Sequence, residues 1–175
     1  MNTRWKSILL NFIWFQTIWF CVVLFQNQFV WLAILLILGY VAIMPFRQVN
    51  MLFGVAMAFY GTFVDGTMAA WGFYEFTPHG RFLIPMWLVV LWVAFGFMLR
   101  VSLTYLRGRY LLASILGAVS GPLSYFAAAK LGAVSFPLSL VLTGLMIGAW
   151  WAITVPLWLR IDLWLSTRIE QVRLK

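Results

Sequence analysis

The stretch Met51–Phe73, MLFGVAMAFYGTFVDGTMAAWGF, decides the fold of this chain. It is apolar and long enough to cross a bilayer as one helix, which takes about 20 residues, yet Asp65 lies near its middle. Small residues recur with Asp65 at steps of three or four and so share one face of that helix. These residues are Gly54, Ala58, Gly61, Ala69 and Gly72. We expect this face to pack closely against another helix, with the carboxyl turned away from lipid.

Asp65 is the first candidate for a functional residue. An aspartate at the centre of a membrane helix costs about 2.5–3.5 kcal/mol on insertion scales, so it requires a partner, a water-filled cavity or a proton. Three interpretations are open: Asp65 ties helices together by hydrogen bonds, couples a proton or an ion, or acts as a general acid or base. Asn11 and Gln16, two amides in the first apolar segment, are candidate partners of Asp65 and candidate ligand-binding residues.

The composition is that of an integral membrane protein. Of the 175 residues, 65% are hydrophobic and 9% are charged, whereas about a quarter of a soluble domain is charged. The net charge of +8 comes from residues at the ends of apolar segments, which indicates contact with anionic lipid and not with nucleic acid. Cys21 and His79 are the single cysteine and histidine. They exclude an intrachain disulfide and metal sites built on several such ligands, and we predict no metal site and no cofactor.

Six apolar segments predict an all-α integral membrane protein with a compact bundle of six transmembrane helices. The segments are Ile8–Phe25, Phe29–Met44, Met51–Phe73, Phe82–Leu99, Tyr110–Ala129 and Leu138–Leu159. With this topology, ten lysines and arginines lie on the side of the two termini and two lie on the other side. The positive-inside rule then places both termini in the cytoplasm.

We divide the chain into a six-span domain, residues 1–159, and a basic cytoplasmic tail, residues 160–175. Apolar residues recur at helical steps in the tail, which predicts an amphipathic helix lying on the cytoplasmic leaflet or docking a soluble partner. They are Ile161, Leu165, Ile169 and Val172. Glu75, His79 and Arg81 predict an outer polar loop, which is either simply solvated or forms the mouth of a cavity.

Three arginines, Arg100, Arg107 and Arg109, follow the fourth segment. We expect them in the inner headgroup region, where they bind phospholipid headgroups or serve as ordinary anchors of the helix end. In the fifth segment, Pro122 predicts a kink, and Ser124 and Tyr125 after it are candidate ligand-binding side chains.

Four motifs between Asn11 and Phe136 carry a family resemblance. They are NFIWFQTIWF, GTFVDGTMAAWGF, PMWLVVLWVAFGFML and GAVSGPLSYFAAAKLGAV. In their order and spacing they resemble the small bacterial inner-membrane proteins of domain-of-unknown-function family 2878. The family name carries no activity. The resemblance implies a bacterial inner membrane and, because members often lie near genes for fatty-acid modification, a role in lipid metabolism.

Three functions are therefore open. The favoured hypothesis is a lipid-handling protein or accessory subunit of a membrane-lipid modification system, with membrane lipid and a lipid-modifying enzyme as partners. The second is a small transporter or substrate-binding component that uses Asp65 as its coupling carboxyl. The third is an intramembrane enzyme that uses Asp65 as acid or base, limited to proton-transfer chemistry because no nucleophile-elbow, di-iron or zinc motif is present.

Overall fold

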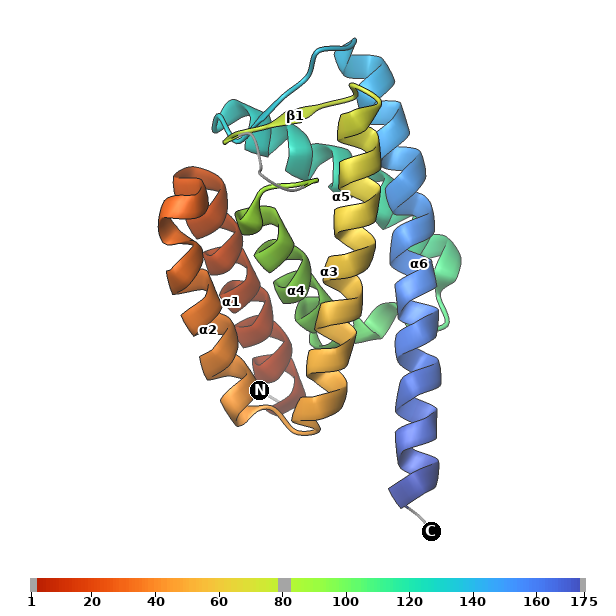
Figure 1. Ribbon diagram of the computed structural model, residues 1–175. Coiled ribbons are helices and arrows are strands. Elements are labelled where there is room, and N and C mark those ends of the chain that lie inside the picture. The colour runs from red at the N-terminus through yellow and green to blue at the C-terminus, as the bar shows by residue number, and fades with distance from the viewer. Residues whose placement is uncertain (1–2, 79–82, 174–175) are drawn as a thin grey trace.

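The computed structural model describes residues 3–78 and 83–173, and this part of the chain is mostly helical (Figure 1). The α-helices are α1 (Thr3–Phe25), α2 (Val30–Ile43), α3 (Arg47–Ala70), α4 (Met86–Val101), α5 (Tyr110–Lys130) and α6 (Leu140–Arg173). Short 3-10 helices, η1 (Gln26–Phe29) and η2 (Thr104–Leu106), connect α1 to α2 and follow α4. The predicted apolar segments thus each coincide with one of the six α-helices, although α6 continues well past the predicted end at Leu159, and the all-α class is confirmed.

Four helical segments among the described residues are long and apolar enough to cross a membrane. They are Trp5–Ile43, Arg47–Ala70, Tyr110–Lys130 and Leu140–Arg168. The first contains both α1 and α2, which run antiparallel in Figure 1. Helix α4 is apolar but has only 16 residues. The chain is therefore a membrane protein with four candidate spanning segments, whereas the predicted count of six crossings and the predicted orientation are not established by length and composition.

The helix ends follow from local backbone preferences. Helix α3 stops at Ala70, three residues before the predicted end, and Gly72 turns the chain away with φ +76°, a value that glycine adopts at no steric cost. Helix α4 begins after Pro85, not at Phe82, because proline favours the first turn of a helix. Helix α6 continues without a break from Leu140 to Arg173, so the predicted tail is helical but extends the sixth helix instead of forming a separate one.

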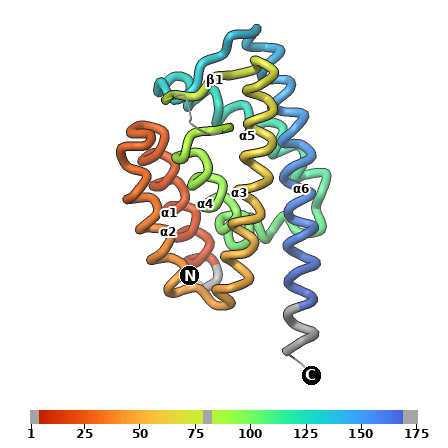
Figure 2. The backbone as a smooth tube through the Cα atoms, viewed as in Figure 1, coloured from red at the N-terminus to blue at the C-terminus, as the bar shows by residue number. Residues whose placement is uncertain are grey.

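Figure 1 shows α1 and α2 along one side of the molecule and α6 along the other, with α3 and α4 between them. Helix α5 is inclined to this set, and the backbone trace of Figure 2 shows the same crossing. The start of α1 and the end of α6 lie at the same end of the bundle. At the opposite end, two short antiparallel strands, β1 (Glu75–Phe76) and β2 (Val134–Ser135), pair with each other. The sequence patterns did not predict these strands.

The small-residue face of α3 packs against α4, as predicted. A Cβ added at Gly61 would overlap the indole ring of Trp92, and one at Gly54 would lie 3.0 Å from the Phe97 ring. Helices α5 and α6 approach in the same way, because a Cβ at Gly117 would overlap the backbone of α6 at Trp151. Close approach through small residues is how membrane helices gain packing energy.

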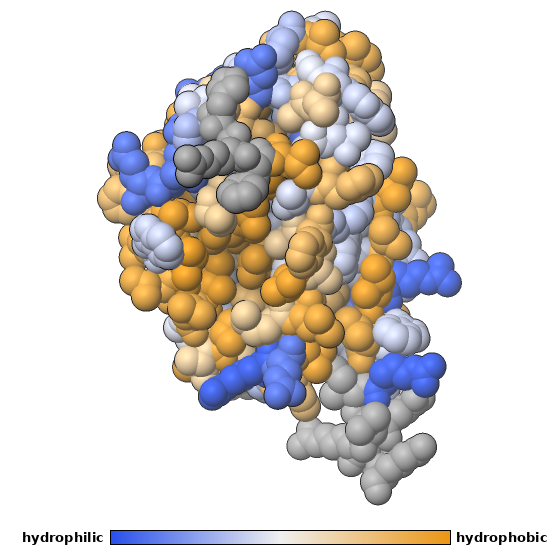
Figure 3. Space-filling view, in the orientation of Figure 1, coloured by the Kyte–Doolittle hydropathy of each residue, from blue (hydrophilic) through white to orange (hydrophobic). Residues whose placement is uncertain are grey.

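Large apolar side chains cover much of the outside of the bundle. Ile43 is 80% exposed, Phe59 75% and Leu111 78%. Apolar residues dominate the face drawn in Figure 3, with hydrophilic residues in separate patches. A soluble protein of this size rarely exposes so large an apolar surface, so lipid is the natural covering of these helices.

Candidate functional site

Asp65 lies in the interior of the bundle and is 1% exposed. Its Oδ1 accepts hydrogen bonds from the hydroxyls of Tyr74, at 2.7 Å, and Tyr125. Its Oδ2 accepts a hydrogen bond from Trp92 Nε1 at 2.7 Å. These donors come from the segment after α3, from α5 and from α4, so the carboxyl joins three parts of the chain to α3. Burial and the neighbouring carboxyl raise the pKa of Tyr74 well above its ordinary value, which keeps this phenol a protonated donor.

The cavity beside Asp65 is too small for a substrate. Its volume is about 10 Å³, and Tyr74, Tyr125 and Trp151 close it. A space of this size holds about one water molecule. The geometry therefore favours the first interpretation of Asp65, in which the carboxyl ties helices together by hydrogen bonds.

The structure brings Tyr125 to Asp65 but not the other candidate residues. Asn11 is buried against a different part of α4, where its Nδ2 donates to the Tyr40 hydroxyl at 2.7 Å and its Oδ1 accepts from Ser102 Oγ at 2.6 Å. Ser124 accepts a hydrogen bond from Trp19 Nε1 at 3.1 Å. Gln16 lines a groove between α1 and α5. The predicted pairing of Asn11 or Gln16 with Asp65 was wrong, because aromatic donors closer to Asp65 occupy both carboxyl oxygens.

Sequence reasoning missed Trp92 and Tyr74 as the partners of Asp65. The sequence holds no signal for either partner, because the packing of Trp92 opposite Gly61 follows only from the way α3 and α4 cross. Glu75 is exposed within β1, as expected for a solvated loop. The predictions for His79 and Arg81 fall outside the described residues.

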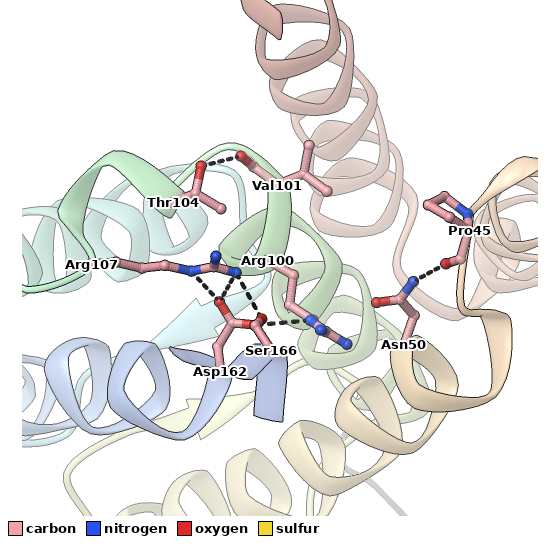
Figure 4. A network of polar contacts seen from close by, with 8 residues as sticks. All are labelled: Pro45, Asn50, Arg100, Val101, Thr104, Arg107, Asp162 and Ser166. Carbon is pink, nitrogen blue, oxygen red and sulfur yellow. Dashed lines mark hydrogen bonds and ion pairs between the residues drawn. The ribbon is translucent and has the colours of Figure 1, made fainter. Parts of the chain in front are cut away.

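A second polar cluster joins the end of α4 to α6 (Figure 4). Asp162 of α6 is 0% exposed, and its carboxylate accepts hydrogen bonds from Arg100 Nε at 2.9 Å and from Arg107 Nε at 2.8 Å. Arg107 also reaches Ser166 Oγ at 3.4 Å. One carboxylate thus accepts hydrogen bonds from two guanidinium groups. The cluster carries a net charge of about +1, because arginine stays protonated in proteins.

Asp162 binds both Arg100 and Arg107, a partner that the sequence analysis did not foresee, and their predicted role as headgroup ligands or helix-end anchors stays a prediction. Arg109, the third predicted headgroup ligand, precedes α5, where its carbonyl accepts a hydrogen bond from Ala113 N at 3.0 Å. Asp162 was missed although its spacing identifies it. It lies three and four residues after Leu159 and Trp158, which are both buried, and so shares their inward face.

A larger cavity opens between α1 and α5, with a volume of about 660 Å³. We call it the α1–α5 groove. Its walls are mostly apolar and aromatic, and Phe95 and Met98 of α4 and Trp151 of α6 form part of its lining. The walls include Phe12, Phe15, Trp19 and Phe20 of α1 and Leu123 and Ala127 of α5. Polar groups are few, and they include Gln16, Ser120, Ser124 and Lys130. The volume is within the range of about 300–1,000 Å³ that is usual for small-molecule sites.

A family model described as protein of unknown function (DUF2878) matches residues 8–157. The chain belongs to the DUF2878 family. The matched residues contain all four motifs on which the resemblance was based, together with Asp65, its three donors and both walls of the groove. Asp162 lies beyond the residues that match the DUF2878 model. No curated protein and no solved structure matches the chain.

Among the described residues, no group of three or more histidine, cysteine, aspartate or glutamate side chains is placed to hold a metal ion. The polar chemistry of the site consists of hydroxyl, indole and guanidinium donors around two buried carboxyls.

Proposed function

We propose that this DUF2878 protein handles membrane lipids in the inner membrane of a bacterium and serves a membrane-lipid modifying enzyme as an accessory subunit. One acyl chain of the lipid occupies the α1–α5 groove. The observation that carries this proposal is the groove itself, an apolar space of about 660 Å³ between two helices of membrane-spanning length and composition.

The proposed topology has six crossings with both termini in the cytoplasm. It is supported by the antiparallel course of α1 and α2 and by the position of the first and last helix ends at one end of the bundle (Figure 1). The excess of lysine and arginine at that end is the charge bias expected for the cytoplasmic side. Helix α4 counts as the fourth crossing although it is short, because its neighbours and not lipid surround most of it.

The lining of the groove fits an acyl chain better than a polar solute. Aromatic rings from α1 and aliphatic side chains from α5 offer dispersion contacts along the whole groove. Within a bilayer there is no hydrophobic gain in moving an acyl chain from lipid to protein, so shape and close contact must decide which chain binds. A rigid aromatic wall is suited to that discrimination, because Trp19 is fixed to Ser124 by a hydrogen bond.

One end of the groove carries a cation. Lys130 ends α5 and lines the groove, and Gln26 Nε2 donates to Gly132 O at 3.4 Å, which ties the end of α1 to the chain just after α5. In the proposed topology this end faces the outer leaflet. An ammonium group at that level attracts the phosphate of a lipid whose acyl chain lies in the groove.

A matched pair of tryptophan substitutions on α5 tests the groove. Ala127 lines it and Val119, which is 56% exposed, does not. Ala127→Trp fills the groove, so we expect native mass spectrometry of the purified protein to show one phospholipid fewer per molecule, with about 10-fold lower occupancy of the groove. Val119→Trp should retain as much lipid as the unchanged protein. Equal retention by the two variants, or no bound lipid in the unchanged protein, would contradict the proposal.

The accessory role is tested in cells that lack the gene. We expect the modified fraction of membrane acyl chains to fall, and to be restored by the unchanged gene and by Val119→Trp but not by Ala127→Trp. The measurement is the acyl-chain profile of extracted lipids. Identical profiles with and without the gene would remove the accessory role while leaving lipid binding to be judged by mass spectrometry.

A further inference from the structure

The guanidinium group of Arg100 has a buried nitrogen to which the described part of the protein offers no partner. The Arg100 side chain is 9% exposed. Its Nε donates to Asp162, and its Cζ lies 5.3 Å from the centre of the Phe53 ring. Nη1 is buried and makes no hydrogen bond with any described residue. Buried polar atoms of this kind are rare in native proteins and call for a specific explanation.

The unpartnered nitrogen belongs to a residue that lines a cavity of about 640 Å³. The cavity lies among α1, α2, the start of α3 and the end of α4, and we call it the Arg100 cavity. In Figure 4, Arg100 lies between Asp162 and Asn50, and its terminal nitrogens extend away from the carboxylate toward the helix of Asn50. Asp162 and Phe53 therefore fix the guanidinium, and Nη1 keeps an unused hydrogen-bond donor at the edge of a residue that lines the cavity.

The other polar groups of the Arg100 cavity add a hydrogen-bond donor. The Tyr40 hydroxyl accepts a hydrogen bond from Asn11 Nδ2 at 2.7 Å, which directs its own hydrogen elsewhere. Asn50 Nδ2 donates to Pro45 O at 2.6 Å, and in Figure 4 the Asn50 oxygen is turned toward Arg100. Among the residues that the structure describes, no aspartate or glutamate lines the cavity, and the adjacent cluster of Arg100, Arg107 and Asp162 carries a net positive charge. The electrostatic preference of the cavity is therefore for an anion.

We propose that the Arg100 cavity binds the phosphate group of an anionic membrane phospholipid through Arg100 Nη1 and the Tyr40 hydroxyl. The apolar part of the lining, from Leu10, Trp14 and Ile43, accepts the glycerol and the first part of the acyl chains. The cavity lies at the end of the bundle where α1 and α3 begin. This is where the phosphates of one leaflet meet the protein.

This site goes beyond the proposed lipid role and stands apart from the α1–α5 groove. The two cavities share no lining residue, because Ser7, Leu10, Asn11 and Trp14 of α1 line one and Phe12, Phe15, Gln16 and Trp19 line the other. If Ala127→Trp did not reduce lipid retention, the proposal for the Arg100 cavity would be unaffected. A negative result at Arg100 would likewise leave the proposal for the α1–α5 groove unaffected.

The test compares Arg100→Gln with Arg109→Gln, which removes the same charge from a residue that does not line the cavity. Each protein is placed in nanodiscs of phosphatidylcholine with a small fraction of phosphatidylglycerol, and the lipid that remains bound is counted by native mass spectrometry. A hydrogen bond between two charged groups is among the strong ones, so we expect Arg100→Gln to retain about 10-fold less phosphatidylglycerol and Arg109→Gln to retain the normal amount. Equal retention by the two variants would overturn the proposal.

Two further arms keep the result clear. Tyr40→Phe removes one hydrogen-bond donor from the site without changing the partners of Asp162. It decides the test if Arg100→Gln fails to fold. Lower phosphatidylglycerol retention by Tyr40→Phe then supports the site, and unchanged retention overturns it.

Inorganic phosphate is added as a competitor. Failure to displace phosphatidylglycerol at millimolar concentration supports a lipid as the source of the phosphate, whereas displacement overturns the lipid assignment in favour of a free anion.

Discussion

Replacing Asp65 tests whether the buried carboxyl ties the bundle together or does chemistry. In Asp65→Ala, Tyr74, Tyr125 and Trp92 lose their acceptor, and these three residues are 1%, 8% and 4% exposed. The two tyrosine rings lie 5.3 Å apart, so their hydroxyls can turn toward each other and recover one hydrogen bond. The Trp92 nitrogen and one hydroxyl then stay unsatisfied, at about 1–3 kcal/mol each, which predicts a loss of about 2–6 kcal/mol of stability.

Asp65→Asn should behave differently. An asparagine oxygen can accept from Trp92 Nε1, and its amide nitrogen can donate to the tyrosine hydroxyls, because a hydroxyl can rotate to become an acceptor. We therefore expect a loss of about 1 kcal/mol. Thr67→Ala serves as the control on α3, since Thr67 is half-buried and its Oγ1 donates to Phe63 O within its own helix. It should change stability by about 0.5 kcal/mol or less.

The assay is reversible unfolding in mixed micelles, followed by far-ultraviolet circular dichroism. The order Thr67→Ala, Asp65→Asn, Asp65→Ala, from smallest to largest loss, is the expected result. If Asp65→Asn were as damaging as Asp65→Ala, the carboxylate charge and not the hydrogen-bond pattern would matter. If all three variants were as stable as the unchanged protein while lipid-related activity disappeared only in the Asp65 variants, the structural interpretation would be refuted.

Two other predictions concern packing and topology. Gly61→Ala should lower the free energy of unfolding by about 1–3 kcal/mol, because its Cβ would overlap Trp92 and force a shift. The Cβ of Gly39→Ala meets nothing within 4 Å, so this variant should be neutral or stabilising by up to about 1 kcal/mol. Thermal unfolding in detergent measures both variants, and equal effects would contradict the packing argument. For topology, Ser135→Cys and Thr167→Cys are made in a Cys21→Ala background, and an impermeant maleimide should label Ser135→Cys in intact cells but Thr167→Cys only after the membrane is opened. Labelling of both from outside would reject the proposed orientation.

The helices could be predicted from the sequence because each depends on a long apolar run and on local signals such as Gly72 and Pro85. The inward orientation of Asp65 followed in the same way, from the spacing of Gly54 and Gly61 on its face. Both patterns are properties of a single helix. They required no knowledge of which helices are neighbours.

The partners of the polar residues could not be predicted in this way. Tyr74 and Trp92 reach Asp65 from two separate segments, 9 and 27 residues away, and Asp162 reaches Arg100 across 62 residues. Such contacts depend on how the helices cross, and a periodic pattern within one helix does not contain that information. The cavities are harder still, because they are spaces left between helices, α1 and α5 for the groove and α1 to α4 for the Arg100 cavity.

The burial of helix α4 and of Arg100 at its end explains why the second carboxyl is needed. Of its 16 residues, 11 are buried, so its neighbours shield it from lipid and it does not have to match the bilayer thickness. At about 1.5 Å per residue it spans about 24 Å, less than the hydrocarbon core of about 30 Å. The Arg100 side chain at its end is 9% exposed, and a guanidinium buried to that extent requires a counter-charge. Helix α6, the longest described helix, brings Asp162 to it.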